Sequence, residues 1–182
     1  VVWDLATDQI TELPSASALS NGHDVLGFGT WLNQDCCTTS KWDAMQWQVR
    51  SLATPFVKRD LINPILQPTE ILIADHMSWH NAQPDRLVPV VTATYRFGNN
   101  STPWRAWDDE ILALQTDNPT GATVWRYGHH RSDVGSDSDP AVPYFWYMPR
   151  INVSQDGRWA LFTSNWEKTL GVEPGGAEHR QD

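Results

Sequence analysis

The chain has 182 residues, of which 40% are hydrophobic and 19% are charged; this composition indicates a globular protein and excludes a disordered one. Thirteen Lys and Arg stand against 22 Asp and Glu, and the net charge of −9 argues against a nucleic-acid partner. No run approaches the roughly 20 apolar residues of a membrane helix, so membrane insertion is not expected.

The distribution of turn-forming and aromatic residues favours many short strands. Twelve Pro and 11 Gly punctuate the whole length, 11 Trp are present, and no long helical periodicity occurs. Such a mixture predicts an all-β fold.

The first third of the chain predicts a hairpin followed by two strand regions. Residues 1–13 form two short strands around a turn, and residues 21–33 form a strand with its hairpin. Residues 34–42 are polar and are expected to be irregular. Alternating apolar and polar residues predict a strand over 44–52, and the prolines of 54–69 predict a linker.

The middle of the chain predicts a second group of strands. Residues 70–81 and 87–96 are strand-like, although Pro89 excludes a fully paired central position. Residues 110–115 and 123–127 form the next hairpin, and residues 128–143 form a polar, acidic loop.

A final hairpin is expected between Arg150 and Trp166. Ile151 and Val153 alternate with polar residues, and Gln155-Asp-Gly is a turn because Gly adopts positive φ without a Cβ clash. Its second strand, 159–163, is apolar on both faces, so we expect it to lie between two packed layers.

The run Ser154-Gln-Asp-Gly-Arg-Trp-Ala-Leu-Phe-Thr-Ser-Asn resembles the TolB-like (WD40-like, PD40) β-propeller repeat, whose blade core reads roughly S-P-D-G-x-x-φ-φ-F-x-S with φ apolar. Gln155 stands where that pattern usually has Pro. The resemblance covers about one blade and implies a propeller. It names no function, because this fold hosts enzymes and binding modules alike.

A second regularity is the spacing of three histidines. His23, His76 and His129 lie 53 residues apart, twice, and a repeat of this length is typical of propeller blades. We therefore expect a single, incomplete propeller domain over 1–182, a fragment of a larger propeller with three to four four-stranded blades. The expected blade segments are 1–13, 21–69, 70–127 and 144–182.

Equivalent positions would place these three histidines around one central mouth. They could then ligate a divalent metal such as zinc or manganese. The favoured interpretation is that they form structural hydrogen bonds between blades, with no cofactor.

A larger constellation has the residue types of a sugar site, since Trp stacks on pyranose rings and Arg grips carboxylates. Its members are His76, Trp79, His80, His129, His130, Arg131, Tyr147 and Arg150. The competing interpretation is that Trp79, Trp146, Trp159 and Trp166 pack between blades and that Arg150 pairs with Asp133 or Asp156.

The favoured function is a non-catalytic recognition or scaffold module, extracytoplasmic, that binds a glycan or a protein. One alternative is a polysaccharide lyase, in which His or Tyr abstracts a proton and Arg neutralises the carboxylate. Another is a structural subunit whose open edges are completed by missing blades or by other subunits. The adjacent Cys36 and Cys37 are expected to be free or partly buried thiols, because a disulfide between neighbours is strained. The alternatives are a disulfide between these two residues and a bond to a segment outside this sequence.

Overall fold

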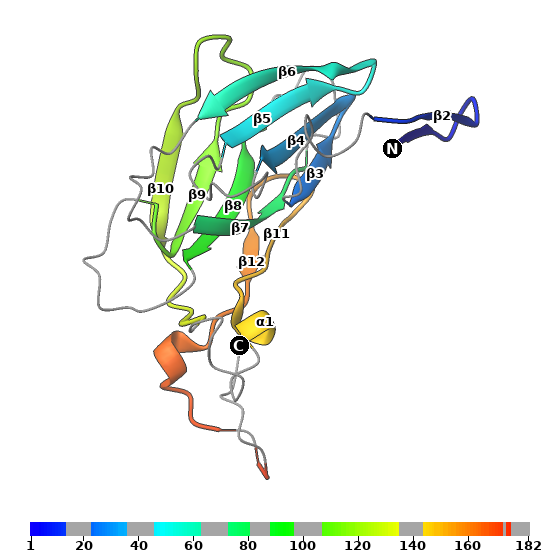
Figure 1. Cartoon of the computed structure of the whole chain (residues 1–182). Helices are drawn as coiled ribbons and strands as arrows, with labels where there is room; N and C mark the ends of the chain where they lie inside the picture. The colour runs from blue at the N-terminus through cyan, green and yellow to red at the C-terminus, as the bar shows by residue number, and fades with distance from the viewer. Residues whose placement is uncertain are drawn as a thin grey trace, which may run out of the picture.

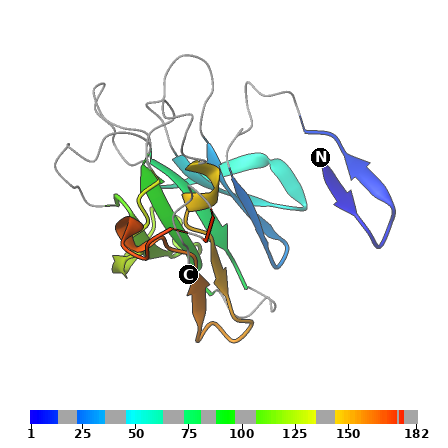
Figure 2. The ribbon, with the colours of Figure 1, turned by 90° about the horizontal axis from the view of Figure 1, so that it is seen from below.

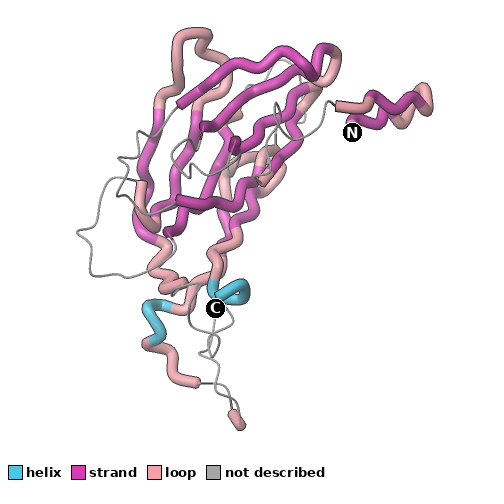
Figure 3. The backbone as a smooth tube through the Cα atoms, viewed as in Figure 1, coloured by secondary structure: helices cyan, strands magenta, loops and turns pink. Residues whose placement is uncertain are grey.

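The computed structural model of the chain describes residues 1–13, 23–35, 46–62, 73–80, 88–96, 107–134, 144–172 and 174–175. Within these ranges the strands form four antiparallel sheets, and the helical elements are one turn, α1 (Tyr144–Tyr147), and the 3-10 turn η1 (Trp166–Lys168). The predicted all-β class is confirmed (Figures 1 and 3). Cys36 and Cys37 lie outside the described residues.

The first four-stranded sheet is a meander in which each strand pairs with the next one in the sequence. It contains β3 (Asp24–Gly27), β4 (Thr30–Asp35), β5 (Gln46–Ser51) and β6 (Thr54–Ile62). The prediction that residues 54–69 form a linker is wrong for 54–62. Pro55 is tolerated there because β6 is an edge strand, where a missing N–H breaks no ladder bond on the open side.

The second four-stranded sheet repeats the same topology. It contains β7 (Ile73–Ser78), β8 (Val90–Arg96), β9 (Glu110–Leu114) and β10 (Val124–His129). All five residues of β9 are buried, as expected for a strand covered on both faces. Pro89 directly precedes β8, where its missing N–H costs no ladder bond.

Two shorter sheets are separate hairpins. β1 (Val2–Asp4) pairs with β2 (Gln9–Thr11), and β11 (Ile151–Val153) pairs with β12 (Ala160–Phe162). Both hairpins lie where the sequence predicted them. Viewed from below, β1–β2 stands away from the rest of the strands (Figure 2).

The main core lies between the two four-stranded sheets. Its buried members come from both of them: Leu32, Trp47, Val49, Leu61, Trp79, Val90 and Leu114. Trp79 follows β7 and lies against Gly27 of β3, where an added Cβ would be 2.8 Å from the indole ring. The absence of a side chain at Gly27 therefore allows Trp79 to reach the first sheet.

A smaller core joins the second sheet to β11–β12. Ala93 and Ile111 of the second sheet pack against Ile151 of β11. Hydrogen bonds reinforce this contact: the Ser78 hydroxyl donates to the Asn152 side chain (3.1 Å) and accepts from the Val153 N–H (3.0 Å).

The outer margins of the two large sheets are also tied together. The Arg59 guanidinium on β6 donates to the backbone carbonyl of Asn118 (2.6 Å) and to that of Thr116, in the loop between β9 and β10. The sheets are thus fixed both at their shared core and at this rim.

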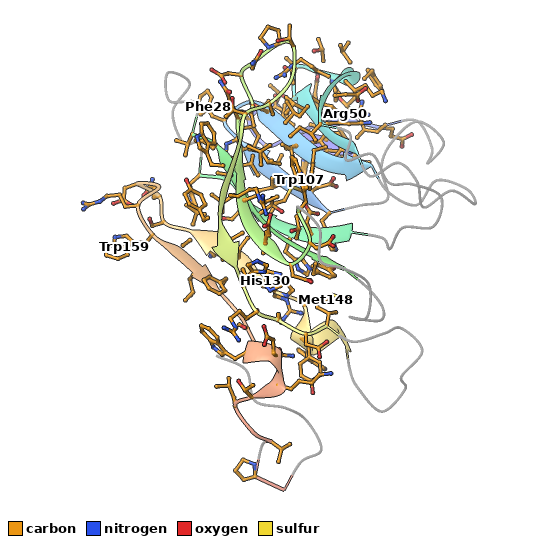
Figure 4. All side chains as sticks on the ribbon, turned by 90° about the vertical axis from the view of Figure 1, so that its left-hand side faces the viewer. Phe28, Arg50, Trp107, His130, Met148 and Trp159 are labelled. Atoms are coloured by element: carbon orange, nitrogen blue, oxygen red, sulfur yellow. The ribbon has the colours of Figure 1, made fainter. Side chains whose placement is uncertain are left out.

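The second strand of the last hairpin is a correction to the sequence-based expectation. Leu161 is 77% exposed and Trp159 is 71% exposed, so β12 does not lie between two packed layers. Figure 4 shows Trp159 at the far tip of the hairpin. The physical reason is that β11–β12 covers the second sheet with one face, and no strand among the described residues covers the other.

The four candidate packing tryptophans divide in the same way. Trp79 is buried between sheets, as predicted, whereas Trp146, Trp159 and Trp166 are exposed. The three exposed tryptophans therefore do not belong to the cores described above.

Candidate functional site

Three aromatic rings stack in a row that crosses from the first sheet to the second. His23, which directly precedes β3, lies 4.5 Å between ring centroids from His76 of β7. His76 lies 5.4 Å from the ring of Tyr95 on β8. Of the three histidines that share the 53-residue spacing, His23 and His76 therefore lie side by side.

Both imidazoles form hydrogen bonds between sheets. His23 donates through Nδ1 to the backbone carbonyl of Asp75, and His76 donates through Nδ1 to the carbonyl of Pro149, 2.8 Å away. Burial lowers the pKa of His76 to about 4, so its ring is neutral at physiological pH. The two histidines thus act as links between sheets.

Asp75, next to this row, is a fully buried carboxyl group. Trp47 Nε1 and Thr92 Oγ1 donate to its Oδ2 at 2.7 and 2.9 Å, whereas its Oδ1 has no hydrogen-bond partner among the described residues. Burial raises the pKa of Asp75 to about 6, and burial also raises the pKa of the neighbouring Asp24.

His130 is buried on a different part of the second sheet. Its Nε2 donates to the Thr94 carbonyl (2.7 Å), and its Nδ1 accepts from the Ser132 N–H (2.9 Å), so both ring nitrogens are occupied. Burial lowers the pKa of His130 to about 4. This ring positions the backbone that follows β10.

His129 corrects the prediction of three equivalent imidazoles around one mouth. It is the last residue of β10, the outermost strand of its sheet, and it is exposed, whereas His23 and His76 lie at the first strands of their sheets. The 53-residue spacing does not place His129 in an equivalent position, because the loops within the two sheets differ in length. Within the described ranges, no three His, Cys, Asp or Glu side chains are grouped so that they could hold a metal ion.

The other members of the predicted sugar constellation are dispersed. Trp79 is buried and donates to the Val88 carbonyl at 2.7 Å, Tyr147 is buried, and His80 is half-buried after β7. The structure does bring the segments of His130, Arg131, Tyr147 and Arg150 together, since the Ser132 hydroxyl donates to the Tyr147 carbonyl.

These segments belong to a compact region below the sheets, which we call the C-terminal junction: residues 131–134, 146–150 and 163–168 (Figure 1). Asn165 holds the first and third segments together, because its side chain bonds the Asp133 N–H and carbonyl, each at 2.8 Å. Thr163 and Arg150 join the second and third through bonds of 3.0 Å in both directions.

The C-terminal junction presents two pairs of arginine over tryptophan. The Arg131 guanidinium lies 6.0 Å from the ring centroid of Trp166, and that of Arg150 lies 5.9 Å from the centroid of Trp146. Both indoles are exposed, and Arg131 also forms an exposed ion pair with Glu167 at 3.0 Å. Cation–π contacts at exposed sites hold such side chains in place by roughly 0.5–1 kcal/mol.

The backbone of this region is strained. Arg131, Trp166, Glu167 and Lys168 have φ values of 59°, 47°, 55° and 62°. The Glu167 N–H donates to the Arg131 carbonyl at 2.7 Å, so these four left-handed residues adjoin each other. Such conformations cost about 1–3 kcal/mol each and gather at ligand sites. Trp146, Trp166 and Glu167 were absent from the predicted site. The fold brings Trp166 and Glu167 to Arg131, whereas Trp146 lies only four residues before Arg150.

Comparison with protein-family models, curated proteins and solved structures finds no match for this chain. No helix in the described part of the chain is both long and apolar enough to cross a bilayer.

Proposed function

We propose that this chain is a non-catalytic recognition module, part of a β-propeller, that binds an acidic glycan at the C-terminal junction. An extracytoplasmic location, where such glycans occur, belongs to the same proposal. The ligand class is defined by chemistry: pyranose rings that carry carboxylates.

The arrangement of the sheets supports the propeller. Two consecutive four-stranded meanders pack face to face, and a third sheet begins beside them. The first strands of successive sheets adjoin, since β7 contacts both β3 and β11. Blades arranged around an axis are expected to have their first strands gathered at one side and their last strands at the other.

The use of the histidines supports a binding role over a catalytic one. His76 and His130 form hydrogen bonds that hold backbone segments, and their lowered pKa values leave them weakly basic. A polysaccharide lyase needs a base whose pKa lies near the operating pH.

The observation that carries the proposal is the pairing of exposed Trp and Arg on strained backbone. Trp146 and Trp166 offer flat apolar faces on which a sugar ring can stack. Arg131 stands beside Trp166, and its exposed ion pair with Glu167 is of the kind that contributes only about 0–1 kcal/mol, so a ligand carboxylate can replace Glu167 at little cost.

Binding to a panel of polyuronates and neutral glycans, measured by calorimetry, tests this proposal. We expect Trp166→Ala and Arg131→Met each to weaken polyuronate binding about tenfold or more. Trp125→Ala is the matched control, because Trp125 is an equally exposed indole on β10, outside the junction. Equal effects of the junction and control variants, or binding to no glycan, would contradict the proposal.

The same polyuronate samples distinguish the lyase alternative. A lyase would generate unsaturated uronate products, which absorb in the ultraviolet, and the recognition module would not. A protein partner in place of a glycan would leave the glycan panel empty.

A further inference from the structure

The two hairpin sheets are each half the size of the sheets between them. β3–β6 and β7–β10 contain four strands each, whereas β1–β2 and β11–β12 contain two each. Two strands with one apolar face are rarely stable alone in water. The hairpins are thus two incomplete sheets within the described part of the chain.

The β12 edge is chemically ready to accept a strand. The bonds Ser154 N–H to Trp159 carbonyl and Thr163 N–H to Arg150 carbonyl flank the β11–β12 ladder. In an antiparallel pair hydrogen-bonded positions alternate, so Ala160 and Phe162 direct their backbone groups away from β11. Among the described residues, β12 pairs with β11 only.

The two hairpins also match in side-chain pattern. Asn152 is opposite Leu161 in one, and Trp3 is opposite Ile10 in the other. Leu161, Trp3 and Ile10 are 77%, 56% and 62% exposed. Placing β1 antiparallel beside β12 with Leu161 opposite Trp3 aligns them in one apolar row, and it places Phe162 opposite Val2 on the face toward the second sheet.

We propose that β1–β2 of one copy of this chain pairs along β12 of a second copy, so that the two halves complete one four-stranded sheet in the order β11-β12-β1-β2. The reciprocal pairing closes a two-fold dimer. Counted over the described residues of two copies, four complete sheets and two composite ones fall within the usual range of about 4–8 blades for propellers. This inference rests on the propeller arrangement proposed above but not on the proposed ligand.

Strand addition explains why apolar side chains are exposed on strands that have a single partner among the described residues. An unpaired edge with apolar side chains is a liability for a monomer, which natural sheets cover or block with charge. Here the exposed Trp159 directly precedes β12 and the exposed Leu161 lies within it. The matching hairpin β1–β2 projects away from the other strands (Figure 2).

Light scattering of the 182-residue chain at tens of micromolar is the first test. We expect a particle of twice the 20.6 kDa chain mass. A monomer at all concentrations, or an open-ended series of larger species, would overturn the closed dimer.

The second test maps the contact. Ala160→Pro removes an N–H that points away from β11, so the hairpin persists while strand addition is blocked. We expect this variant to be monomeric with unchanged far-ultraviolet circular dichroism, and Ala160→Ser to remain dimeric. A dimer that survives Ala160→Pro would show that another surface holds the copies together.

A disulfide reports the register directly. Leu161 and Trp3 would form a non-hydrogen-bonded pair across the junction, with Cα atoms about 4.5 Å apart, a spacing that a disulfide spans. Leu161→Cys/Trp3→Cys, in a background with Cys36→Ser and Cys37→Ser, should give a covalent dimer on mild oxidation. The control is Leu161→Cys/Lys58→Cys, in which Lys58 is an exposed residue of β6, and it should give no covalent dimer. Equal crosslinking of the two double variants would refute the register.

Discussion

The second four-stranded sheet has two interfaces, and they are built differently. Toward the first sheet it presents Val90, Leu114 and Trp79 to an apolar core. Toward β11–β12 it presents a smaller apolar group with His76 and Ser78, which form directional hydrogen bonds to Pro149 and to β11.

The difference shows how a sheet can be held by a partner of unequal size. Two full sheets bury enough apolar surface to hold each other by the hydrophobic effect, at roughly 25 cal/mol for each Å². A two-stranded partner covers less, so hydrogen bonds contribute more of its attachment and fix its position. The apolar interface should therefore be sensitive to volume and the polar one to pH and to single hydrogen bonds.

The largest effect should come from emptying the apolar interface. Trp79→Ala removes a buried indole and is expected to lower the free energy of unfolding by about 4 kcal/mol, measured by urea denaturation. Trp159→Ala, which removes an exposed indole, should change it by less than about 0.5 kcal/mol. Similar losses in both variants would mean that Trp79 does not hold the sheets together.

Acid should also weaken the second sheet where His130 bonds the Thr94 carbonyl and the Ser132 N–H, beside the polar interface. His130 has a folded-state pKa of about 4 against 6.5 in the unfolded chain, so stability is lost as pH falls from 6.5 toward 4. At about 1.4 kcal/mol per pKa unit, the loss from His130 is about 3 kcal/mol. His130→Gln, whose amide can still donate to the Thr94 carbonyl, should flatten the dependence of melting temperature on pH. An unchanged slope would contradict the buried neutral ring.

The apolar interface should respond to acid in the opposite direction. The folded-state pKa of Asp75 is about 6, above its ordinary value of 3.8, so its ionisation destabilises the fold as pH rises through this range. Asp75→Asn should therefore lose less stability on alkalinisation from pH 5 to 8 than the parent chain does, in melting curves at each pH. The side chains of His23 and Asp24 face Asp75 as well. A parent curve identical to that of the variant would exclude Asp75 as the source.

Overfilling the apolar interface should have a smaller effect than emptying it. Gly27→Ala places a Cβ 2.8 Å from the Trp79 ring and should cost about 2 kcal/mol. Gly128→Ala on β10 is the matched control, because a Cβ there meets nothing within 4 Å. If both substitutions lower the free energy of unfolding by the same amount, the cause is the strand propensity of the new residue and not its contact with Trp79.

The smallest effect should come from one bond of the polar interface. Ser78→Ala removes a donor to Asn152 and an acceptor for the Val153 N–H, and we expect a loss of about 1 kcal/mol. A double-mutant cycle with Asn152→Ala isolates the pairwise contribution in urea denaturation. Fully additive losses would mean that the two side chains act independently.

Strand positions could largely be predicted from the sequence, because period-two alternation and Gly or Pro punctuation are local signals. The exposure of each face could not. Gln48 and Arg50 occupy the polar side of an alternating strand, yet both are buried, and Arg50 donates to Gln48, Asn33 and the Pro55 carbonyl. Conversely, the apolar Leu161 is exposed, because burial depends on which sheets face each other.

The site was predictable only in part for the same reason. The equal spacing predicted three equivalent histidines, but the structure stacks His23 on His76 and places His129 at the end of the outermost strand of its sheet. Arg131 and Arg150 were recognised as candidates, but Trp166 and the left-handed turn around it arise from contacts between segments more than 30 residues apart.

The meander topology has a consequence for how the chain is made. Every strand of a large sheet bonds to its immediate neighbour along the polypeptide, so each sheet can assemble from local contacts as it leaves the ribosome. The sheet of β3–β6 would nevertheless display Trp47 and Leu32 to water until residue 79 has been synthesised. A nascent chain paused before that point is the species on which a holdase chaperone would act.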